Sequence, residues 1–323
     1  MISLEIIEYT PKLAEKWDRF VPKTNNGTLF HTQNFLNYHP EGRFENHHLI
    51  FAEGNRWMGI LPAAAANRGG ERIFASHPGA SFGGIATSLK SGIRRADKMV
   101  ELWIEWAMEH GFAGVEFTRV PVVYHKYPEE HADFCLMRRG GDIVRRELTA
   151  VLRLEDTIEE TTAAFRPEAR TAARKAEKSG VEVTSEGNIP AFHEILAANL
   201  GARHGVDPTH TLEELLDLKS RFPERIHQFN AVRKGEPVAG VSLWEVNRQA
   251  VIAFYISHKQ SAQRYRPLNL LFREIFRWCI ERGYRWFDFG TYTLDMEPNF
   301  GLARFKESFG ARGIFRDTLR LTF

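Results

Sequence analysis

Near its C-terminal end the chain brings a carboxylate and an amine close together in sequence, a pairing suited to group transfer. Asp288 lies between two phenylalanines in Trp286-Phe-Asp-Phe-Gly290. If this segment is a strand, both rings point to one face and the carboxylate points to the other. Lys306 lies in Gly301-Leu-Ala-Arg-Phe-Lys-Glu-Ser-Phe-Gly310, where apolar residues recur at helical spacing and the final glycine can end a helix.

Three residues of this region are candidates for catalysis, and each has a structural alternative. Asp288 can accept a proton from an attacking ammonium, or it can be a structural carboxylate that accepts backbone or arginine hydrogen bonds. Lys306 can neutralise charge on a donor or on a tetrahedral intermediate, whereas a helical lysine is most often an exposed surface residue. Tyr292 can donate a proton to a leaving oxygen or sulfur, although an aromatic residue at a strand end more often packs.

Basic residues gather in the loop before a predicted helix that starts near Pro267. This loop contains Lys259, Arg264 and Arg266. A helix N-terminus offers free N–H groups and the positive end of the helix dipole, so a phosphate group is well placed beside such cations. We assign Asn269, in the first turn of the same helix, to this candidate phosphate site. The alternative is a solvated basic loop.

A second group of cations lies between residues 155 and 180, a segment that we predict to be helical, with Pro167 acceptable at a helix start and Gly180 at its end. Its basic residues recur at every fourth position: Arg166, Arg170, Arg174 and Lys178. Its alanines form a small-residue face that can pack closely on a neighbouring element. Arg170 and Arg174 are candidates for contacts with the phosphates of a nucleotide or a tRNA, and the alternative is an ordinary exposed surface.

The composition is that of a globular chain without a global electrostatic preference. Its 323 residues are 43% hydrophobic and 12% aromatic, enough for a large core, and at about 150 residues per domain they suggest two domains. The formal net charge of +2 gives no overall attraction to nucleic acid or to an anionic membrane. We therefore expect no duplex DNA partner, and anion binding must come from a local patch.

Other features favour a soluble, cytoplasmic protein without a metal site. Cys135 and Cys279 are far apart in sequence, which argues for a reducing compartment and against a disulfide or zinc framework. His204 and His210 lack the helical spacing of metal ligands, and no third ligand is evident. The N-terminus is predicted to be a strand, and no apolar run approaches the roughly 20 residues that span a bilayer.

The two halves of the chain repeat one pattern, in which a hairpin is followed by a helix, a glycine and a strand. Four residue pairs share one sequence offset: Trp106 and Trp278, Gly111 and Gly283, Glu116 and Asp288, Phe117 and Phe289. Composition alone does not explain a fixed offset, so we infer an ancient tandem duplication. The predicted fold class is α/β (α+β), with a mixed, mostly antiparallel sheet flanked by helices in each of two domains, 1–150 and 151–323.

These motifs, taken together, resemble the FemAB-like tandem acyltransferases of the GNAT superfamily. The resemblance includes the Trp-Phe-Asp-Phe-Gly strand, the segment 301–310 and Arg174-Lys-Ala-Glu-Lys-Ser-Gly-Val-Glu-Val183. Thr28-Leu-Phe-His-Thr-Gln-Asn-Phe35 and Pro78-Gly-Ala-Ser-Phe-Gly-Gly84 are similar to the first domain of that group. The resemblance therefore covers most of the chain.

The resemblance implies two tandem GNAT-like domains that transfer an acyl or aminoacyl group to an amine. The activated donor is an aminoacyl-tRNA or an acyl thioester, held by residues 151–323, and residues 1–150 form the acceptor side. Phe305 and Lys306 match a pair whose lysine, in the peptidoglycan-bridge enzymes, contacts the RNA or its phosphates. The candidate acceptor-binding residues are His31, Gln33, Phe82, Arg203 and His204.

One segment departs from the ordinary GNAT pattern. The acyl-CoA phosphate loop of those proteins is Gln/Arg-x-x-Gly-x-Gly/Ala, whereas the corresponding Gln263-Arg-Tyr-Arg-Pro-Leu-Asn269 contains no glycine. The coiled-coil arm of some peptidoglycan enzymes also has no counterpart, because no long heptad run is present. No Gly-x-Ser-x-Gly elbow or Cys/His motif supports a covalent nucleophile, so direct attack by the acceptor amine is the simpler mechanism.

We therefore expect an N-acyltransferase of FemAB type that acts on an amine of a cell-envelope precursor or of another small molecule. It should be a monomer or homodimer with no tightly bound cofactor, and acyl-CoA is a candidate co-substrate. One alternative is an ordinary acyl-CoA-dependent GNAT N-acetyltransferase. The other is a non-catalytic binding module on the same fold, because a fold alone does not establish chemistry.

Overall fold

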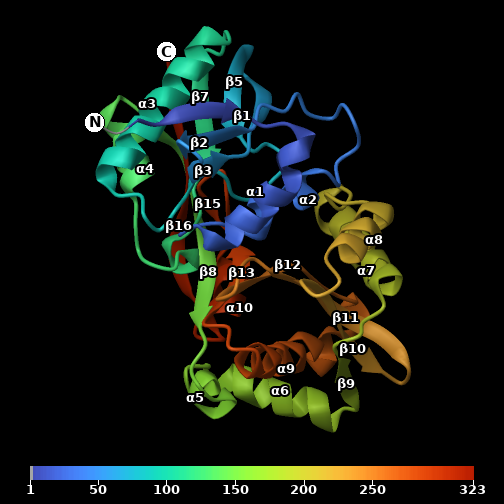
Figure 1. Cartoon of the computed structure of the whole chain (residues 1–323). Helices are drawn as coiled ribbons and strands as arrows, with labels where there is room; N and C mark the ends of the chain where they lie inside the picture. The colour runs from blue at the N-terminus through green and yellow to red at the C-terminus, as the bar shows by residue number, and fades with distance from the viewer. Residues whose placement is uncertain (1–2) are drawn as a thin grey trace. The chain divides into compact units, whose positions relative to one another are not determined.

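The computed structural model describes residues 3–323, apart from the side chains of residues 203 and 204. The chain forms two compact units (Figure 1). The first contains the residues up to 147 together with 315–323, and the second contains residues 148–314. The boundaries fall within the long strands β8 (Asp142–Arg153) and β16 (Arg312–Thr322).

The first unit contains two sheets. Its strands are β1 (Glu5–Glu8), β2 (Leu49–Glu53), β3 (Arg56–Leu61), β4 (Ala64–Arg68), β5 (Glu71–Ser76), β6 (Ala86–Thr87) and β7 (Gly114–Thr118). One sheet has the order β1-β2-β3-β6 and is antiparallel throughout. In the other, β4 pairs with β5 in the antiparallel sense, β5 pairs with β7 in the parallel sense, and β7 pairs antiparallel with β16.

Helices complete the first unit. They are α1 (Ala14–Phe20), α2 (Gln33–Leu36), α3 (Ile93–Glu109) and α4 (His131–Arg138), with 3-10 turns at Pro11–Leu13, Val21–Lys23, Leu29–His31 and Val122–Tyr124. The buried face of α3 includes Met99, Val100 and Trp103, which join Phe51 of β2 and Phe74 of β5 in one hydrophobic cluster. This amphipathic helix therefore covers strands from both sheets.

The second unit is built on one mixed sheet. Its further strands are β9 (Val181–Thr184), β10 (Ile226–Arg233), β11 (Glu236–Glu245), β12 (Ala250–His258) and β13 (Trp286–Thr291). Within this unit the strand order is β8-β13-β12-β11-β10-β9, and all pairs are antiparallel except β12 with β13. A short hairpin of β14 (Thr293–Leu294) and β15 (Glu297–Pro298) follows β13.

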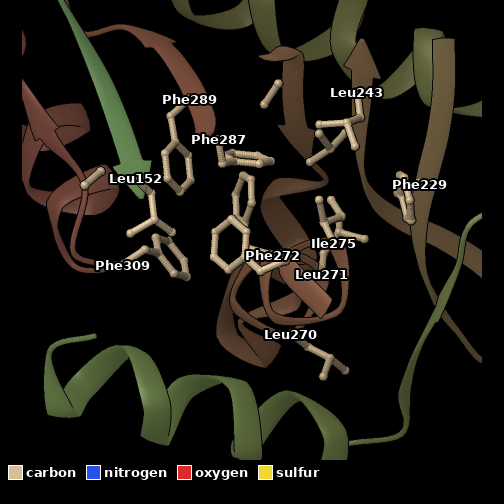
Figure 2. Packing of buried hydrophobic residues seen from close by; sticks show 14 of the residues in the cluster. Leu152, Phe229, Leu243, Leu270, Leu271, Phe272, Ile275, Phe287, Phe289 and Phe309 are labelled. Atoms are coloured by element: carbon tan, nitrogen blue, oxygen red, sulfur yellow. The ribbon is translucent and has the colours of Figure 1, made fainter. Parts of the chain in front are cut away.

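The helices of the second unit are α5 (Ile158–Ala163), α6 (Pro167–Lys178), α7 (Ile189–His204), α8 (Leu212–Arg221), α9 (Pro267–Glu281) and α10 (Phe300–Glu307), with a 3-10 turn at Gln260–Tyr265. The core lies where α9 meets β13 and α10. Phe272 of α9 is fully buried, and its ring centroid lies 4.9 Å from that of Phe289 and 5.2 Å from that of Phe309. Figure 2 shows these rings packed together with Phe287 and Leu152.

Several local predictions are confirmed. Thr211 and Glu214 form the predicted capping box at the start of α8. The duplicated elements also keep their offset, because α3 ends at Glu109 and α9 at Glu281, while β7 begins at Gly114 and β13 at Trp286. In both units this helix and strand follow an antiparallel hairpin, β2–β3 or β10–β11.

The helical prediction for residues 155–180 is confirmed, with Pro167 at the start of α6. Arg166 adopts an extended conformation (φ −60°, ψ 147°) before Pro167, so α5 and α6 are separate helices. One expectation differs from the structure. Residues 315–323 belong to the first unit, although the sequence placed them in the second. The reason is a long-range pairing in which Thr318–Thr322 of β16 lie opposite Gly114–Thr118 of β7.

Both cysteines are buried free thiols. Within residues 3–323, no helix has the length and apolarity that crossing a membrane requires.

Truncation of Phe272 tests the core of the second unit. Phe272→Ala should lower the free energy of unfolding by about 3–5 kcal/mol, because it removes a ring from a packed interior. Phe300→Ala removes the same atoms from a side chain that is 78% exposed, so its effect should stay within about 0.5 kcal/mol. Urea denaturation followed by tryptophan fluorescence measures both. Equal effects would contradict the assignment of Phe272 to the core.

Candidate functional site

Two neighbouring parallel strands of the second unit separate partway along their length. The parallel ladder of β12 and β13 has three residue pairs and ends at Ile252 opposite Asp288. β12 nevertheless continues to His258 and β13 to Thr291. The register of β13 on its other neighbour, β8, also shifts between Asp288 and Thr291. Beyond the last pair, β12 therefore has N–H and C=O groups on its β13 side that lie outside the ladder.

A buried polar network holds β13 at the point where it leaves β12. Gly290 has a positive φ of 76°, and its N–H donates to Oδ1 of Asp288 at 2.6 Å. The hydroxyl of Thr149 donates to the same oxygen at 2.5 Å. The ammonium of Lys306 donates to the carbonyl oxygens of Gly290 and Thr291, each at 2.8 Å. Carboxylate and ammonium together fix this irregular turn of the strand.

Both charged members of the network are buried. Asp288 is 0% exposed and Lys306 is 3% exposed. Burial lowers the pKa of Lys306 to about 8, while the nearby carboxylate of Asp288 acts in the opposite direction. The structure thus rules out the alternative in which Lys306 is an exposed surface lysine. Asp288 accepts hydrogen bonds from Gly290 and Thr149, which agrees with the alternative in which it is a structural carboxylate.

A cavity of about 490 Å³ lies beside the part of β12 that extends beyond its ladder with β13. One wall comes from Ile256 and His258 of β12, a second from residues 263–269 at the start of α9, and a third from α10 and the residue before it. The lining residues are Ile256, His258, Gln263, Arg266, Pro267, Leu268, Asn269, Asn299, Gly301, Leu302 and Phe305. The cavity therefore combines apolar walls with a cation beside a helix N-terminus.

A second cavity of about 440 Å³ adjoins the first. The two share Arg266, Asn269, Gly301 and Phe305 in their linings. The second adds Glu168, Ala169 and Ala172 of α6, Arg304 of α10, and Ser308, which follows that helix. An elongated ligand can therefore extend from β12 past the start of α9 toward α6.

Arg266 occupies an unusual backbone conformation at the start of α9. Its φ is 58° and its ψ is 42°, the left-handed region, which for a residue other than glycine costs about 1–2 kcal/mol. In the segment Gln263–Asn269, Arg266 stands at the position of the first glycine of the Gln/Arg-x-x-Gly-x-Gly/Ala pattern. The loop thus has a glycine-like backbone turn without a glycine, and it places a guanidinium at the cavity.

The structure brings together some of the predicted donor-site residues and not others. Arg266, Asn269 and Phe305 line both cavities. Lys259 and Arg264 flank the same loop, but neither belongs to the described linings, and the guanidinium of Arg264 lies 4.8 Å from the ring centroid of Tyr265.

Arg170 and Arg174 also lie outside the linings, although α6 contributes other residues to the second cavity. Arg170 donates to the carbonyl oxygen of Ala163 at 3.3 Å, and Arg174 is exposed. Tyr292 is buried, and burial, followed by the charge of Glu307, raises the pKa of its hydroxyl. That hydroxyl therefore stays protonated at neutral pH.

Three predicted acceptor-side residues are buried inside the first unit. His31 is 0% exposed, bonds to the hydroxyl of Thr28 at 2.8 Å, and has its pKa lowered to about 4 by burial. Gln33 is 1% exposed, and Phe82 is 0% exposed with its ring centroid 5.4 Å from that of Tyr124. Their positions are those of packing residues. The side chains of Arg203 and His204 lie outside the described part of the structure.

The first unit has a much smaller gap at the corresponding place. There, β6 and β7 belong to different sheets, and the segments beside them meet in one parallel bridge between Gly83 and Arg119. The cavity at this gap is about 20 Å³ and is lined largely by polar side chains, among them His125 and Asp133. Asp133 forms an ion pair with Arg119 at 3.2 Å, and burial raises the pKa of its carboxyl to about 6. Of these two gaps, the one in the second unit has room for an organic ligand.

Sequence reasoning missed most of the apolar cavity wall. Ile256 and His258 follow the end of the β12–β13 ladder, and no local motif marks where a parallel ladder stops. Asn299 could have been predicted, because asparagine is a preferred residue before a helix. Its side chain caps α10 by accepting the N–H of Leu302 at 2.9 Å.

The comparisons with known proteins agree with this geometry. Residues 163–307, which lie within the second unit, match the family model of the acetyltransferase (GNAT) domain. Among solved structures, the chain is similar to the crystal structure of FemX, with 12% sequence identity, a TM-score of 0.76, and coverage of 99% of this chain and 97% of that chain.

Two further structures share the fold. L-PGS from Bacillus licheniformis has 14% identity, a TM-score of 0.62, and coverage of 96% of this chain and 91% of its own. A tandem GNAT protein from the clavulanic acid biosynthesis pathway has 11% identity, a TM-score of 0.59, and coverage of 99% and 98%. No curated protein matches the sequence. These similarities confirm the predicted fold class, and the family model places a GNAT domain at residues 163–307.

The buried ammonium of Lys306 makes stability depend on pH in a defined window. Its pKa is about 8 in the folded chain, whereas the ordinary value for a lysine, which applies to the unfolded chain, is 10.5. Between these values the unfolded chain binds more protons, so the free energy of unfolding rises with pH. Relative to Lys306→Met, the wild type should gain about 2–3 kcal/mol from pH 7.5 to 10.5.

Urea denaturation at several pH values measures this difference, and other titrating groups cancel between the two proteins. The exposed substitution Lys175→Met controls for the loss of a lysine. A difference between wild type and Lys306→Met that does not change with pH would rule out a charged, buried Lys306.

Proposed function

We propose that this chain is an N-acyltransferase that holds an activated acyl donor in the cavity of the second unit and transfers the acyl group to an amine. The observation that carries the proposal is the cavity of about 490 Å³ beside the end of β12, with Arg266 at the start of α9. The match of residues 163–307 to the acetyltransferase (GNAT) domain supports the same reaction class.

The cavity offers different contacts to different parts of a donor. The guanidinium of Arg266 and the N–H groups of the first turn of α9 suit a phosphate group. The part of β12 that extends beyond its ladder with β13 suits an extended donor that carries amide groups, because such a donor can add to the strand by main-chain hydrogen bonds. Leu302 and Phe305 of α10 form an apolar wall for the remainder.

The reaction that we propose needs no covalent intermediate with the protein. The lone pair of the acceptor amine attacks the acyl carbonyl carbon, an N–C bond forms, and the bond from that carbon to the leaving oxygen or sulfur breaks. The ammonium proton passes to solvent or to a base. Tyr292 is our candidate proton donor to the leaving group, since burial raises its pKa and keeps its hydroxyl protonated.

Asp288 and Lys306 act in this proposal as positioning residues. Their bonds to Gly290 and Thr291 keep β13 apart from β12. Neither side chain belongs to the described lining of the cavity, although Phe305, which precedes Lys306, does. Loss of the network should therefore change the shape of the donor site as well as stability.

Both donor classes remain candidates. FemX and L-PGS share the fold, and an aminoacyl donor would be an aminoacyl-tRNA, whose 3′ end also combines phosphate with an ester-linked acyl group. The specific observation that favours an acyl thioester of coenzyme A is the left-handed backbone of Arg266, a conformation that glycine adopts readily, at the position of the first glycine of the GNAT phosphate-loop pattern. We propose as acceptor an amine of a cell-envelope precursor, peptidoglycan included, or of another small molecule, and we place the reaction in the cytoplasm, where both donors are made.

Ligand-induced stabilisation tests the donor site. A donor present at 100 times its dissociation constant adds about 2.7 kcal/mol, which corresponds to a rise of a few degrees in melting temperature. Arg266→Ala should weaken donor binding by about tenfold, because it removes a charge-assisted contact to phosphate. Arg264→Ala, outside the described linings, is the matched control. Thermal melts with acetyl-CoA and with aminoacyl-tRNA measure the effects.

The outcomes separate the candidates. Stabilisation by acetyl-CoA alone favours a thioester donor, and stabilisation by aminoacyl-tRNA alone favours the aminoacyl donor. If neither ligand stabilises the protein, the chain is a non-catalytic module and the proposal is wrong.

Paired substitutions test the role of Asp288. Asp288→Asn keeps an oxygen that can accept the bonds from Gly290 and Thr149, so it should retain most of the stability and transfer activity. Asp288→Ala leaves both donors unpaired and should cost about 2–4 kcal/mol together with activity. A general base would give the opposite pattern, in which Asp288→Asn abolishes turnover while the protein stays folded. Melting curves and the rate of acyl transfer decide between the two.

A further inference from the structure

The first unit contains an open cavity whose lining is strongly cationic. Its volume is about 1090 Å³, and it lies among α1, the turn between β2 and β3, the segment after β6 and the start of α3. Its lining includes six cationic side chains: Lys16, Arg19, Lys23, Arg56, Lys90 and Arg95. Glu53 is the carboxylate among the described lining residues. The whole chain has 43 basic and 41 acidic residues, so this imbalance is local.

The cations of this cavity are only partly neutralised by the protein itself. Arg19 pairs with Glu15 at 3.0 Å. Two further guanidiniums share Glu53, because Arg95 lies 3.0 Å and Arg56 lies 3.5 Å from the same carboxylate oxygen. Nε of Arg95 is buried and has no hydrogen-bond partner within the part of the chain that the structure describes. The ammonium of Lys16 lies 4.2 Å from the ring centroid of Trp57. Such crowding of like charges is relieved when an anion binds.

The cavity also has an apolar wall. Phe20, Trp57, Met58 and Leu89 line it beside the cations, and Leu89 is 49% exposed. A ligand that fits must therefore combine several negative charges with a flat apolar part. A nucleotide with a diphosphate group has this combination, and its size is within the range that such a cavity holds.

We propose that this cavity is a second ligand site, which binds a nucleotide diphosphate group against its cations and the attached ring against Phe20 and Leu89. The other macromolecular partners of basic surfaces fit less well. A bilayer is flat and leaves a concave cavity unfilled. Single-stranded RNA needs exposed aromatic platforms, whereas Trp57 is 8% exposed.

The site goes beyond the proposed donor cavity and does not depend on it. Every described lining residue belongs to the first unit, whereas the donor cavity belongs entirely to the second. Substitutions in one cavity therefore leave the residues of the other unchanged. This separation lets one set of variants test the two sites independently.

Calorimetric titration with ADP tests the proposal on the full chain. Lys23→Glu combined with Lys90→Glu reverses two exposed charges of the cavity and should weaken ADP binding by about tenfold or more, since each reversal replaces attraction by repulsion. Lys175→Glu combined with Lys178→Glu makes the same charge change on α6 in the second unit and should leave binding within about twofold. Raising the salt from about 50 to about 300 mM should weaken binding by screening.

The other outcomes overturn the proposal. These are an absence of ADP binding by the wild type at millimolar concentration, equal binding by the Lys23/Lys90 variant, or loss of binding in Arg266→Ala instead, which would place ADP in the donor cavity. Sedimentation with phosphatidylglycerol vesicles gives the remaining test. Vesicle binding that depends on Lys23 and Lys90, without ADP binding, would identify a membrane-docking surface in place of a nucleotide site. Circular dichroism confirms that each variant is folded.

Discussion

One buried ammonium group determines the shape of the second unit at its cavity. Moving a cation out of water costs several kcal/mol unless it is paired and hydrogen-bonded. Lys306 meets this requirement with the carbonyl oxygens of Gly290 and Thr291 and the nearby charge of Asp288. The carbonyl groups also gain from these contacts, because backbone acceptors beyond the end of a ladder need other hydrogen-bond donors. The same contacts that make the lysine tolerable also keep two adjacent strands from closing on each other.

How far the sequence predicted this arrangement depends on the range of the interactions involved. Local signals worked: the capping box at Thr211 begins α8, and the shared offset located α3 with α9 and β7 with β13. Pro167 was likewise recognised as a helix start, and α6 begins there. The burial of Lys306 could not be predicted, since only a carbonyl pair on another element makes that position favourable.

The candidate site residues also differ in how well the sequence predicted their positions. Arg266, Asn269 and Phe305 were identified from charge and motif, and the structure places them around one cavity. Residues His31 and Gln33 were identified from a motif alone, and motifs do not distinguish a buried polar residue from an exposed one. The two units also differ in the volume of the cavity at the equivalent place, which is about 20 Å³ in the first and about 490 Å³ in the second. The two units thus share a framework, and in the first unit side chains such as Asp133 occupy the gap.

The pairing of β16 with β7 has a consequence for synthesis on the ribosome. Thr118 and Thr318 share a hydrogen bond at 2.9 Å although 200 residues separate them. At about 5–20 residues per second, translation supplies the partner strand roughly 10–40 s after β7 has been made. Throughout that interval β7 has an unpaired edge, while all residues of the second unit are being added. The nascent first unit therefore presents an open sheet edge, a site of edge-to-edge association, until the returning strand arrives.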